Sequence, residues 1–244
     1  MSTLSAALLD PLMKRDPMGP RITYYDDATG ERIEVSTVTL ANWAAKTANL
    51  LRDELGAGPG SRIAVLLPAH WQTAAVLLGA WWIGSEVIFG DPDGADTVAD
   101  IALCTAERLD EADAAVGTDS GLGEVVALSL DAFGKPVPDL PIGVTDYATS
   151  VRVHGDQIVP ERAPGAALNG RTAAEVLALA TDAAHEQGFT PVDRVLSTAP
   201  WRTADDLIGH FLAVLAAGAS LVLVANADPD VLDRRRVTEK VSRG

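Results

Sequence analysis

The feature that most constrains this chain is a pattern that occurs twice along it. Ser61–Asp93 and Asp193–Asp228 each combine an apolar strand, a turn with proline, a helix, a glycine turn and a second apolar strand. Pro68 in the first copy corresponds to Pro200 in the second. Short apolar runs without alternation are typical of strands covered on both faces, and parallel strands need a crossover that is normally a helix. The repeat therefore predicts two similar units, each with a small parallel sheet.

The residues before each copy extend the two units. Amphipathic patterns predict helices at Thr39–Leu55 and Thr172–Gln187, directly upstream of the first and second copies. Arg21–Tyr25 and Glu31–Val35 enclose a turn that contains Asp and Gly, which predicts an N-terminal β-hairpin. We therefore expect an α/β fold with two similar lobes related by internal duplication. Each lobe would be a small, mostly parallel sheet flanked by helices.

The boundaries of the lobes follow from the prolines between the copies. We expect the first lobe, with the N-terminal hairpin, to span residues 1–135 and the second lobe to span residues 161–244. A proline-rich linker and a tight β-hairpin at Val151–Val159 would occupy residues 136–160. The remaining patterns predict helices at Ser5–Met13 and Asp96–Arg108, strands at Ala114–Gly117 and Val125–Leu128, a loop at Ala163–Arg171, and a helix or strand at Asp230–Lys240.

Charge and composition narrow the class of protein. The net charge of −15 argues against a nucleic-acid partner and against an anionic membrane, because both surfaces repel a negative protein. No apolar run reaches the roughly 20 residues of a membrane-spanning helix, and residues 1–17 lack the basic start of a secretion signal. The single cysteine, Cys104, excludes an internal disulfide and fits a reducing compartment. We therefore expect a cytoplasmic protein, and richness in Ala, Asp and Arg with few lysines favours a bacterial source.

Several short motifs follow one another in an order that is characteristic of one superfamily. They are Ile22–Tyr24, Val38–Trp43, Leu55–Pro68, Ala75–Phe89, Asp193–Val224 and, faintly, Arg236–Thr238. In this order they resemble the N-terminal half of the adenylate-forming enzymes, which include acyl-CoA synthetases, luciferases and nonribosomal-peptide adenylation domains. The resemblance covers most of residues 20–240 and implies two related N-terminal lobes, in agreement with the repeat.

The resemblance also implies a loop that binds the phosphates of ATP, and here the sequence departs from the family. That loop is rich in Ser, Thr and Gly and ends in Lys, so that amides, hydroxyls and an ammonium group hold phosphate. Counting back from Thr172, it should lie at Ile158–Leu168, where Ser, Thr and Lys are absent and Glu161 would repel phosphate. The family's adenine motif, ribose-binding Asp and catalytic Lys would lie beyond Gly244. We therefore assign no catalytic residue and no cofactor, because neither ATP with Mg²⁺ nor coenzyme A has a supporting motif.

Two sets of polar residues are candidates for ligand binding. The loops after the apolar strands of both copies are acidic, and ligands of open α/β sheets bind outside the carboxyl ends of strands. The second set lies at the N-terminus of the helix before the second copy, where an anion could be held. The candidates are Asp91, Asp93, Asn226 and Asp228 in the loops, and Asn169, Arg171 and Thr172 at the helix. The alternative is that the loops are solvated turns and that Thr172 is a plain cap in a capping box with Glu175.

Three functions remain open. The first is a non-catalytic relative of adenylate-forming enzymes that acts in binding or assembly. The second is one subunit of a split ligase, and the third is a small protein that binds an acyl, coenzyme A or nucleotide ligand. A truncated lobe would expose sheet edges and apolar faces, so we also expect a protein partner or a homodimer. The scattered histidines and Cys104 predict neither a metal site nor a cysteine nucleophile.

Overall fold

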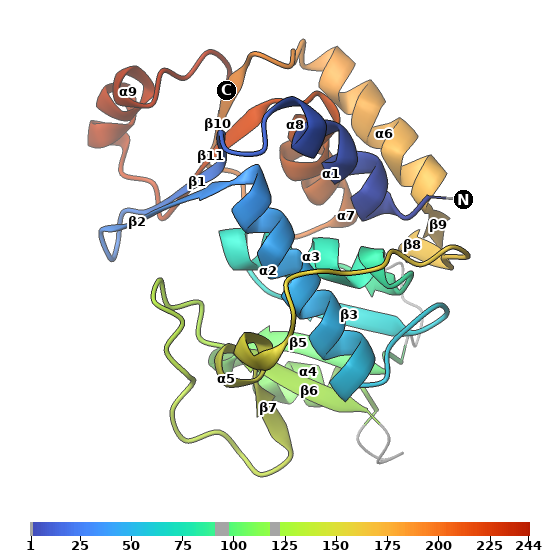
Figure 1. Ribbon diagram of the computed structural model, residues 1–244. Helices are drawn as coiled ribbons and strands as arrows, with labels where there is room; N and C mark the ends of the chain where they lie inside the picture. The colour runs from blue at the N-terminus through green and yellow to red at the C-terminus, as the bar shows by residue number, and fades with distance from the viewer. Residues whose placement is uncertain (1, 91–97, 118–122) are drawn as a thin grey trace.

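The computed structural model describes residues 2–90, 98–117 and 123–244. Helices and strands alternate along most of this length (Figure 1). The helices are α1 (Leu4–Arg15), α2 (Thr37–Asn49), α3 (Trp71–Trp82), α4 (Leu109–Ala115), α5 (Tyr147–Ser150), α6 (Ala173–Glu186), α7 (Ala204–Leu207), α8 (Ala213–Ala216) and α9 (Pro229–Thr238). The strands are β1 (Pro20–Asp26), β2 (Glu31–Ser36), β3 (Arg62–Leu66), β4 (Glu86–Ile88), β5 (Ile101–Thr105), β6 (Glu124–Leu128), β7 (Val144–Asp146), β8 (Ala166–Leu168), β9 (Arg171–Thr172), β10 (Arg194–Ser197) and β11 (Ser220–Ala225).

The strands form two sheets flanked by helices, which confirms the expected α/β class. One sheet has the order β10-β11-β1-β2, and the other has the order β7-β6-β5-β3-β4-β8-β9. Neighbouring strands run parallel except in the antiparallel pairs β1–β2 and β8–β9. Side chains on the two faces of β3 enter different apolar clusters, Ile63 and Val65 on one side and Ala64 on the other. This burial on both faces explains why the strand reads as a continuous apolar run.

The two sheets share one arrangement of strands, with an exchange of hairpins. In the smaller sheet the parallel pair β10–β11 continues into the hairpin β1–β2, and in the larger sheet the pair β3–β4 continues into the hairpin β8–β9. Along the chain, however, each hairpin leads through α2 or α6 into the strand–helix–strand unit of the other sheet. Each sheet therefore takes strands from both ends of the sequence. The division into lobes at residues 1–135 and 161–244 stays a prediction.

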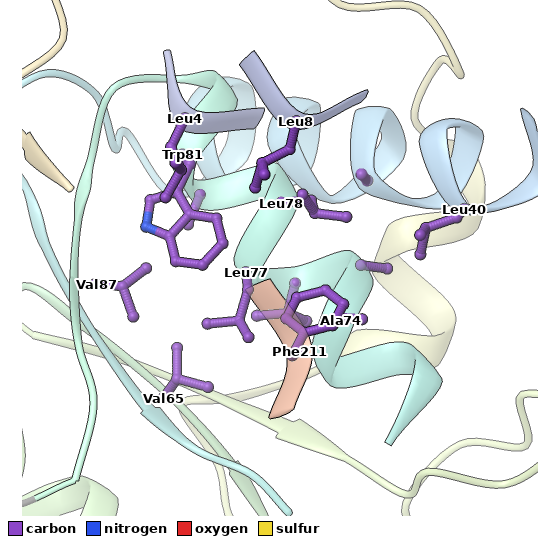
Figure 2. Packing of buried hydrophobic residues seen from close by; sticks show 14 of the residues in the cluster. Leu4, Leu8, Leu40, Val65, Ala74, Leu77, Leu78, Trp81, Val87 and Phe211 are labelled. Carbon is purple, nitrogen blue, oxygen red and sulfur yellow. The ribbon is translucent and has the colours of Figure 1, made fainter. Parts of the chain in front are cut away.

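The core is organised around α3, every residue of which is buried. Figure 2 shows Leu77 and Trp81 of this helix toward Val65 and Val87 of the larger sheet, with Leu4 of α1 drawn next to Trp81. The indole Nε1 of Trp81 donates a hydrogen bond of 2.7 Å to the carbonyl of Ala167. A helix that is apolar all round must be enclosed, and α3 is enclosed by the two sheets and by α1 and α2.

The helices α2 and α3 approach each other closely at Gly79. A Cβ atom at this position would lie 2.8 Å from the carbonyl oxygen of Ala44, 2.9 Å from Cβ of Thr47 and 3.0 Å from the amide nitrogen of Ala48. Two of these atoms belong to the backbone of α2 and cannot rotate away. The helices can therefore pack at this spacing only because residue 79 lacks a side chain.

The helix α9 covers the other face of the smaller sheet, where it appears in red beside β1 and β10 in Figure 1. Its Leu232 packs against a cluster formed by Leu196, Val222 and Val224. Arg235 of α9 also forms an ion pair of 2.6 Å with Asp27 at the end of β1. The sequence left open whether residues 230–240 form a helix or a strand, and the structure has a helix there.

Two local predictions between β4 and β6 are wrong. The expected helix at Asp96–Arg108 is instead the strand β5 followed by a 3₁₀ turn at Ala106–Arg108, in the part that the structure describes. The expected strand at Ala114–Gly117 is the end of α4 and the turn after it. Ile101–Thr105 is a short apolar run that lies between β3 and β6, and in such a run periodicity cannot separate a buried strand from a buried helix.

The expected hairpin at Val151–Val159 is also wrong, and the loop predicted at Ala163–Arg171 contains the short strands β8 and β9. Residues 151–153 form a 3₁₀ turn, and the segment after them runs over α2 without pairing as a strand. Asn49 donates hydrogen bonds to the carbonyls of Gly155 and Gln157, and Lys46 donates one to the carbonyl of His154. Because α2 supplies partners for these carbonyls, the segment needs no partner strand.

The other predicted elements are present. The helices at Ser5–Met13 and Thr39–Leu55 correspond to α1 and to α2 with a π-helical turn at Leu50–Glu54. The strand at Val125–Leu128 is β6. None of the helices in the described residues combines the length and apolarity that crossing a bilayer requires.

Candidate functional site

A groove lies where strands of both sheets end. It has a volume of about 780 Å³ and runs between the hairpin β1–β2, the turn after β3 and the loop after β6. Asp26 ends β1, Asn226 follows β11, Pro68–His70 follows β3, and Ser129–Lys135 follows β6. Ligands of parallel α/β sheets bind outside the carboxyl ends of the strands, and these four segments all leave carboxyl ends.

His70 is the most enclosed polar residue of the groove. Its side chain is 3% exposed, and it caps the first turn of α3, because its Nδ1 accepts a hydrogen bond of 3.1 Å from the amide of Gln72. The ring of Tyr24 meets it edge-on at 4.4 Å between centroids. Burial lowers the pKa of the His70 imidazole and outweighs the opposing effect of Glu31, so the ring is neutral at pH 7. With Nδ1 as an acceptor, Nε2 carries the proton.

Glu31 faces this proton from the start of β2. Its Oε1 lies 3.9 Å from Nε2 of His70, beyond hydrogen-bond distance, and both atoms are buried without a partner. Buried polar atoms without partners are uncommon in folded proteins. The pair can orient a hydroxyl group or a water molecule that accepts from His70 and donates to Glu31. It cannot serve as a base through His70, because one ring nitrogen is occupied and the other is protonated.

The rim of the groove is built from hydrogen-bonded side chains. Asn226 donates to Oδ1 of Asp26 at 2.9 Å, which joins the ends of β11 and β1. Arg32 donates to the hydroxyl of Tyr25 and pairs at 3.1 Å with both Glu34 and Glu239. These contacts make the rim a fixed polar frame.

A second cavity, of about 720 Å³, lies along the same edge and shares Pro68 and Ala69 with the groove. Phe89 and Gly90 line it after β4, and Pro200–Arg202 lines it after β10. The turn after β3 thus separates two cavities at the carboxyl ends of the sheets.

In the segment where the phosphate loop was expected, a side-chain carboxylate of the same segment accepts hydrogen bonds from the backbone amides. Oε1 of Glu161 accepts hydrogen bonds from the amides of Arg162 at 2.7 Å and Ala163 at 2.9 Å. These hydrogen bonds hold the pKa of Glu161 below its usual value. The amides of Glu161 and Gly165 donate to carbonyls at the end of α3 and in the turn after it, those of Trp82 and Gly84. Four backbone amides of this segment, those of residues 161, 162, 163 and 165, therefore already donate within the chain and are not free to bind a phosphate group.

The candidate residues at the start of α6 have structural partners. The side-chain amide of Asn169 accepts from the amide of Phe89 and donates to its carbonyl, both at 2.9 Å, and so extends the pairing of β4. Thr172 and Glu175 form the capping box of the alternative interpretation. Glu175 accepts from both the amide and the hydroxyl of Thr172 at 2.8 Å, which occupies donors that an anion would need. Arg171 is partly exposed at the same turn.

The candidates in the acidic loops are separated by the structure. Asn226 lines the groove, whereas Asp228 is the N-cap of α9 and accepts from the amide of Asp230. Asp91 and Asp93 lie outside the described residues. Asn169 and Thr172 are not among the residues of the groove, so the structure does not bring the two sets into one site. A ligand-binding role for any of these residues stays a prediction.

The sequence prediction missed His70 and Glu31. The signal for His70 was its place directly before the buried helix, where a capping residue is required and Ser, Thr, Asp or Asn is usual. No local pattern links it to Glu31. Among the described residues, no group of three His, Cys, Asp or Glu side chains could hold a metal ion. Cys104 is fully buried in β5, and burial raises the pKa of its thiol to about 11.

Comparison with known sequences gives one family. No protein-family model matches the chain. A protein of Mycobacterium tuberculosis strain H37Rv, described as a TIGR03089 family protein, is 64% identical over 242 residues. The match covers 99% of this chain and 98% of the relative.

Comparison with solved structures gives the fold. MatB of Rhodopseudomonas palustris matches 96% of this chain with a TM-score of 0.72 and 22% identity. An acyl-CoA synthetase of Brucella canis matches 99% with a TM-score of 0.78 and 16% identity, and a benzoate CoA ligase of Burkholderia xenovorans matches 99% with a TM-score of 0.72 and 18% identity. The match covers 47%, 46% and 49% of these three chains, so this chain spans about half the length of each.

Proposed function

The chain belongs to the TIGR03089 family and shares its fold with about half of an acyl-CoA synthetase, and on that premise we propose that it is a non-catalytic binding protein. In this proposal the scaffold of the adenylate-forming enzymes is kept, while the transfer of an adenylyl group is not. The groove at the carboxyl ends of the two sheets is the binding site. The observation that supports the proposal most directly is that the Glu161 carboxylate accepts hydrogen bonds from the amides of Arg162 and Ala163.

This observation bears directly on ATP. A triphosphate is held by backbone amides that point at it and by nearby cations. In this chain a carboxylate already accepts from two such amides. A phosphate group could reach these amides only by displacing the Glu161 carboxylate, and it would then lie beside that negative charge. The chain's net charge of −15 adds a further repulsion.

The groove supports a function in binding a small polar ligand rather than a function in assembly without any ligand. Its floor holds a donor on His70 and an acceptor on Glu31, neither of which has a partner in the chain. Its volume of about 780 Å³ is within the range typical of small-molecule sites. Proteins that only serve as scaffolds have no need for such buried, unpaired polar atoms, which reduce stability.

We also propose that the two strand–helix–strand units arose by internal duplication. The support is the matching order of pairings in β3-β4-β8-β9 and β10-β11-β1-β2, together with the repeated sequence pattern. A duplicated unit that exchanged its hairpin with its copy would produce this arrangement.

The experiment is a calorimetric titration of the protein with ATP, with and without Mg²⁺, combined with an assay for release of pyrophosphate in the presence of mixed carboxylic acids. We expect no ATP binding with a Kd below about 1 mM and no pyrophosphate. The variant Glu161→Gln removes the negative charge while keeping nearly the same side-chain size, and Glu186→Gln on α6 is the matched control. Micromolar, Mg²⁺-dependent ATP binding by the unmodified protein, or any pyrophosphate release, would overturn the proposal.

A further inference from the structure

A smaller pocket lies beside the groove and has a different chemistry. It has a volume of about 250 Å³ and is enclosed by the middle and second half of α2, the start of α3, the helix α5 with the turn after it, and the loop after β6. It shares Ala132 and Phe133 with the groove and otherwise has its own walls. Its lining includes Trp43, Trp71, Tyr147, Lys46 and Arg152.

The walls of this pocket are aromatic. Trp43 and Trp71 meet edge-to-face, with 5.6 Å between ring centroids and 75° between planes. Tyr147 is buried, and its hydroxyl is paired with the hydroxyl of Thr47 at 2.7 Å, so that polar group is already satisfied. Aromatic rings prefer such edge-to-face or offset neighbours. A cavity of roughly 150 Å³ is enough for benzene, so this pocket has room for one ring and a small substituent.

The charges at this pocket are positive. Lys46 and Arg152 line it, and no Asp or Glu of the described part of the chain does, although the net charge of the chain is −15. Each cation uses part of its donor capacity on the backbone. Nζ of Lys46 donates to the carbonyl of His154, and Nη2 of Arg152 donates to the carbonyls of Phe133 and Gly134. A guanidinium has five N–H groups and an ammonium has three, so both retain donors for an anion.

Trp71 adds an unused donor. Its side chain is buried, and its Nε1 has no hydrogen-bond partner among the described residues. The indole N–H of a buried tryptophan usually finds a partner. Aromatic walls, free cationic donors and an unpaired indole N–H together are complementary to an aromatic ring that carries a negative charge.

We propose that this pocket binds a small aromatic anion, with a single ring packed against Trp43 and Trp71 and its charged group toward Lys46 and Arg152. The site is separate from the groove and from any nucleotide site, so it goes beyond the function proposed above. The alternative is that Lys46 and Arg152 serve only to hold residues 133–134 and 154 in place, which would leave the pocket without a ligand.

The test is titration of the full chain with sodium benzoate, sodium benzenesulfonate and phenyl phosphate, followed by tryptophan fluorescence and by calorimetry. We expect saturable binding of at least one of these anions with a Kd below about 1 mM. Benzyl alcohol, which lacks the charge, and cyclohexanecarboxylate, which lacks the aromatic ring, should each bind at least roughly tenfold more weakly.

Variants separate a specific site from nonspecific association. Arg152→Gln should weaken binding roughly tenfold, as expected when a charge-assisted hydrogen bond is lost, whereas the exposed Arg162→Gln should leave it unchanged. Ala148→Leu should abolish binding by filling the pocket, and circular dichroism checks that the variant is folded. If Ala148→Leu does not fold, Arg152→Gln and the uncharged ligand still decide the question. Absence of binding by all three anions up to about 10 mM, or equal binding by Arg152→Gln and Arg162→Gln, would overturn the proposal.

Discussion

The contact between α2 and α3 at Gly79 allows a prediction whose size can be worked out from the structure. Replacement by alanine would place a Cβ atom 2.8 Å from the Ala44 carbonyl and 3.0 Å from the Ala48 amide, so the helices must separate by several tenths of an ångström. Overpacking of this kind costs about 1–3 kcal/mol, while alanine in a helix gains about 1 kcal/mol over glycine. The net effect is a loss of about 0–2 kcal/mol, so we expect Gly79→Ala to lower the free energy of unfolding by about 1 kcal/mol.

A second glycine provides the matched control. Gly209 lies in the helical segment between α7 and α8, and a Cβ atom there would meet nothing within 4 Å. Gly209→Ala should therefore show the gain in helix propensity alone and raise the free energy of unfolding by about 0.5–1 kcal/mol. Urea unfolding followed by circular dichroism measures both variants. If Gly79→Ala is as stable as Gly209→Ala, the helices can separate freely at this crossing, and the account of the core given above is wrong.

Further predictions concern the C-terminal helix, the thiol, a helix cap and the chain between the hairpins. Burial alone would raise the pKa of Glu239, but hydrogen bonds from Tyr25, Arg194 and Arg32 outweigh it and lower that pKa from 4.5 to about 2. Its stabilising effect should therefore be complete above pH 4.5 and be lost as the pH falls toward 2, so Glu239→Gln should destabilise the protein at pH 7 and have little effect near pH 2 in thermal unfolding. Because burial raises the pKa of Cys104 to about 11, the native thiol should resist iodoacetamide at pH 8 and react only after unfolding in urea. Thr172→Ala should cost about 1 kcal/mol through loss of the capping box, and combining it with Glu175→Ala should add little in urea unfolding, because the two residues form one unit. Cleavage at a protease site inserted into residues 155–160 should leave both fragments in one complex on gel filtration, because each sheet takes strands from both sides of the cut, and fragments that separate would contradict the exchanged hairpins.

The strand–helix–strand units could be predicted from the sequence because their signals are local. Apolar runs before and after a proline turn and a buried helix mark β3, α3 and β4 without reference to the rest of the chain. The same rule failed at Ile101–Thr105, where a run of five residues between two turns fits either state. What decides that segment is the space between β3 and β6, which is a tertiary property.

The candidate site was less accessible to sequence analysis because its parts come from distant segments. His70 and Glu31 belong to different elements, and neither has a neighbour in sequence that suggests their approach to 3.9 Å. The capping box at Thr172 could be predicted, since its two residues are three positions apart and interact within one helical turn. The departure from the phosphate-loop pattern was visible as missing residue types, but the hydrogen bonds from the amides of Arg162 and Ala163 to Glu161 required coordinates.

The exchange of hairpins has a consequence for how ligands of the groove can be found. Since β1 and β2 complete the sheet of β10 and β11, the groove exists only when both ends of the chain have folded together. A ligand that binds the folded state alone raises the free energy of unfolding by RT ln(1 + [L]/Kd), which is about 2.7 kcal/mol at a hundredfold excess over Kd. In a chain of this size, such a gain corresponds to a shift of roughly 5–10 °C in the unfolding temperature. Because no part of the groove can melt without the sheets that build it, the whole transition should move with the ligand. Thermal-shift screening with hydroxylated small molecules, with His70→Gln as the variant that disturbs the groove's floor, is therefore a sensitive test of whether the groove binds such a ligand.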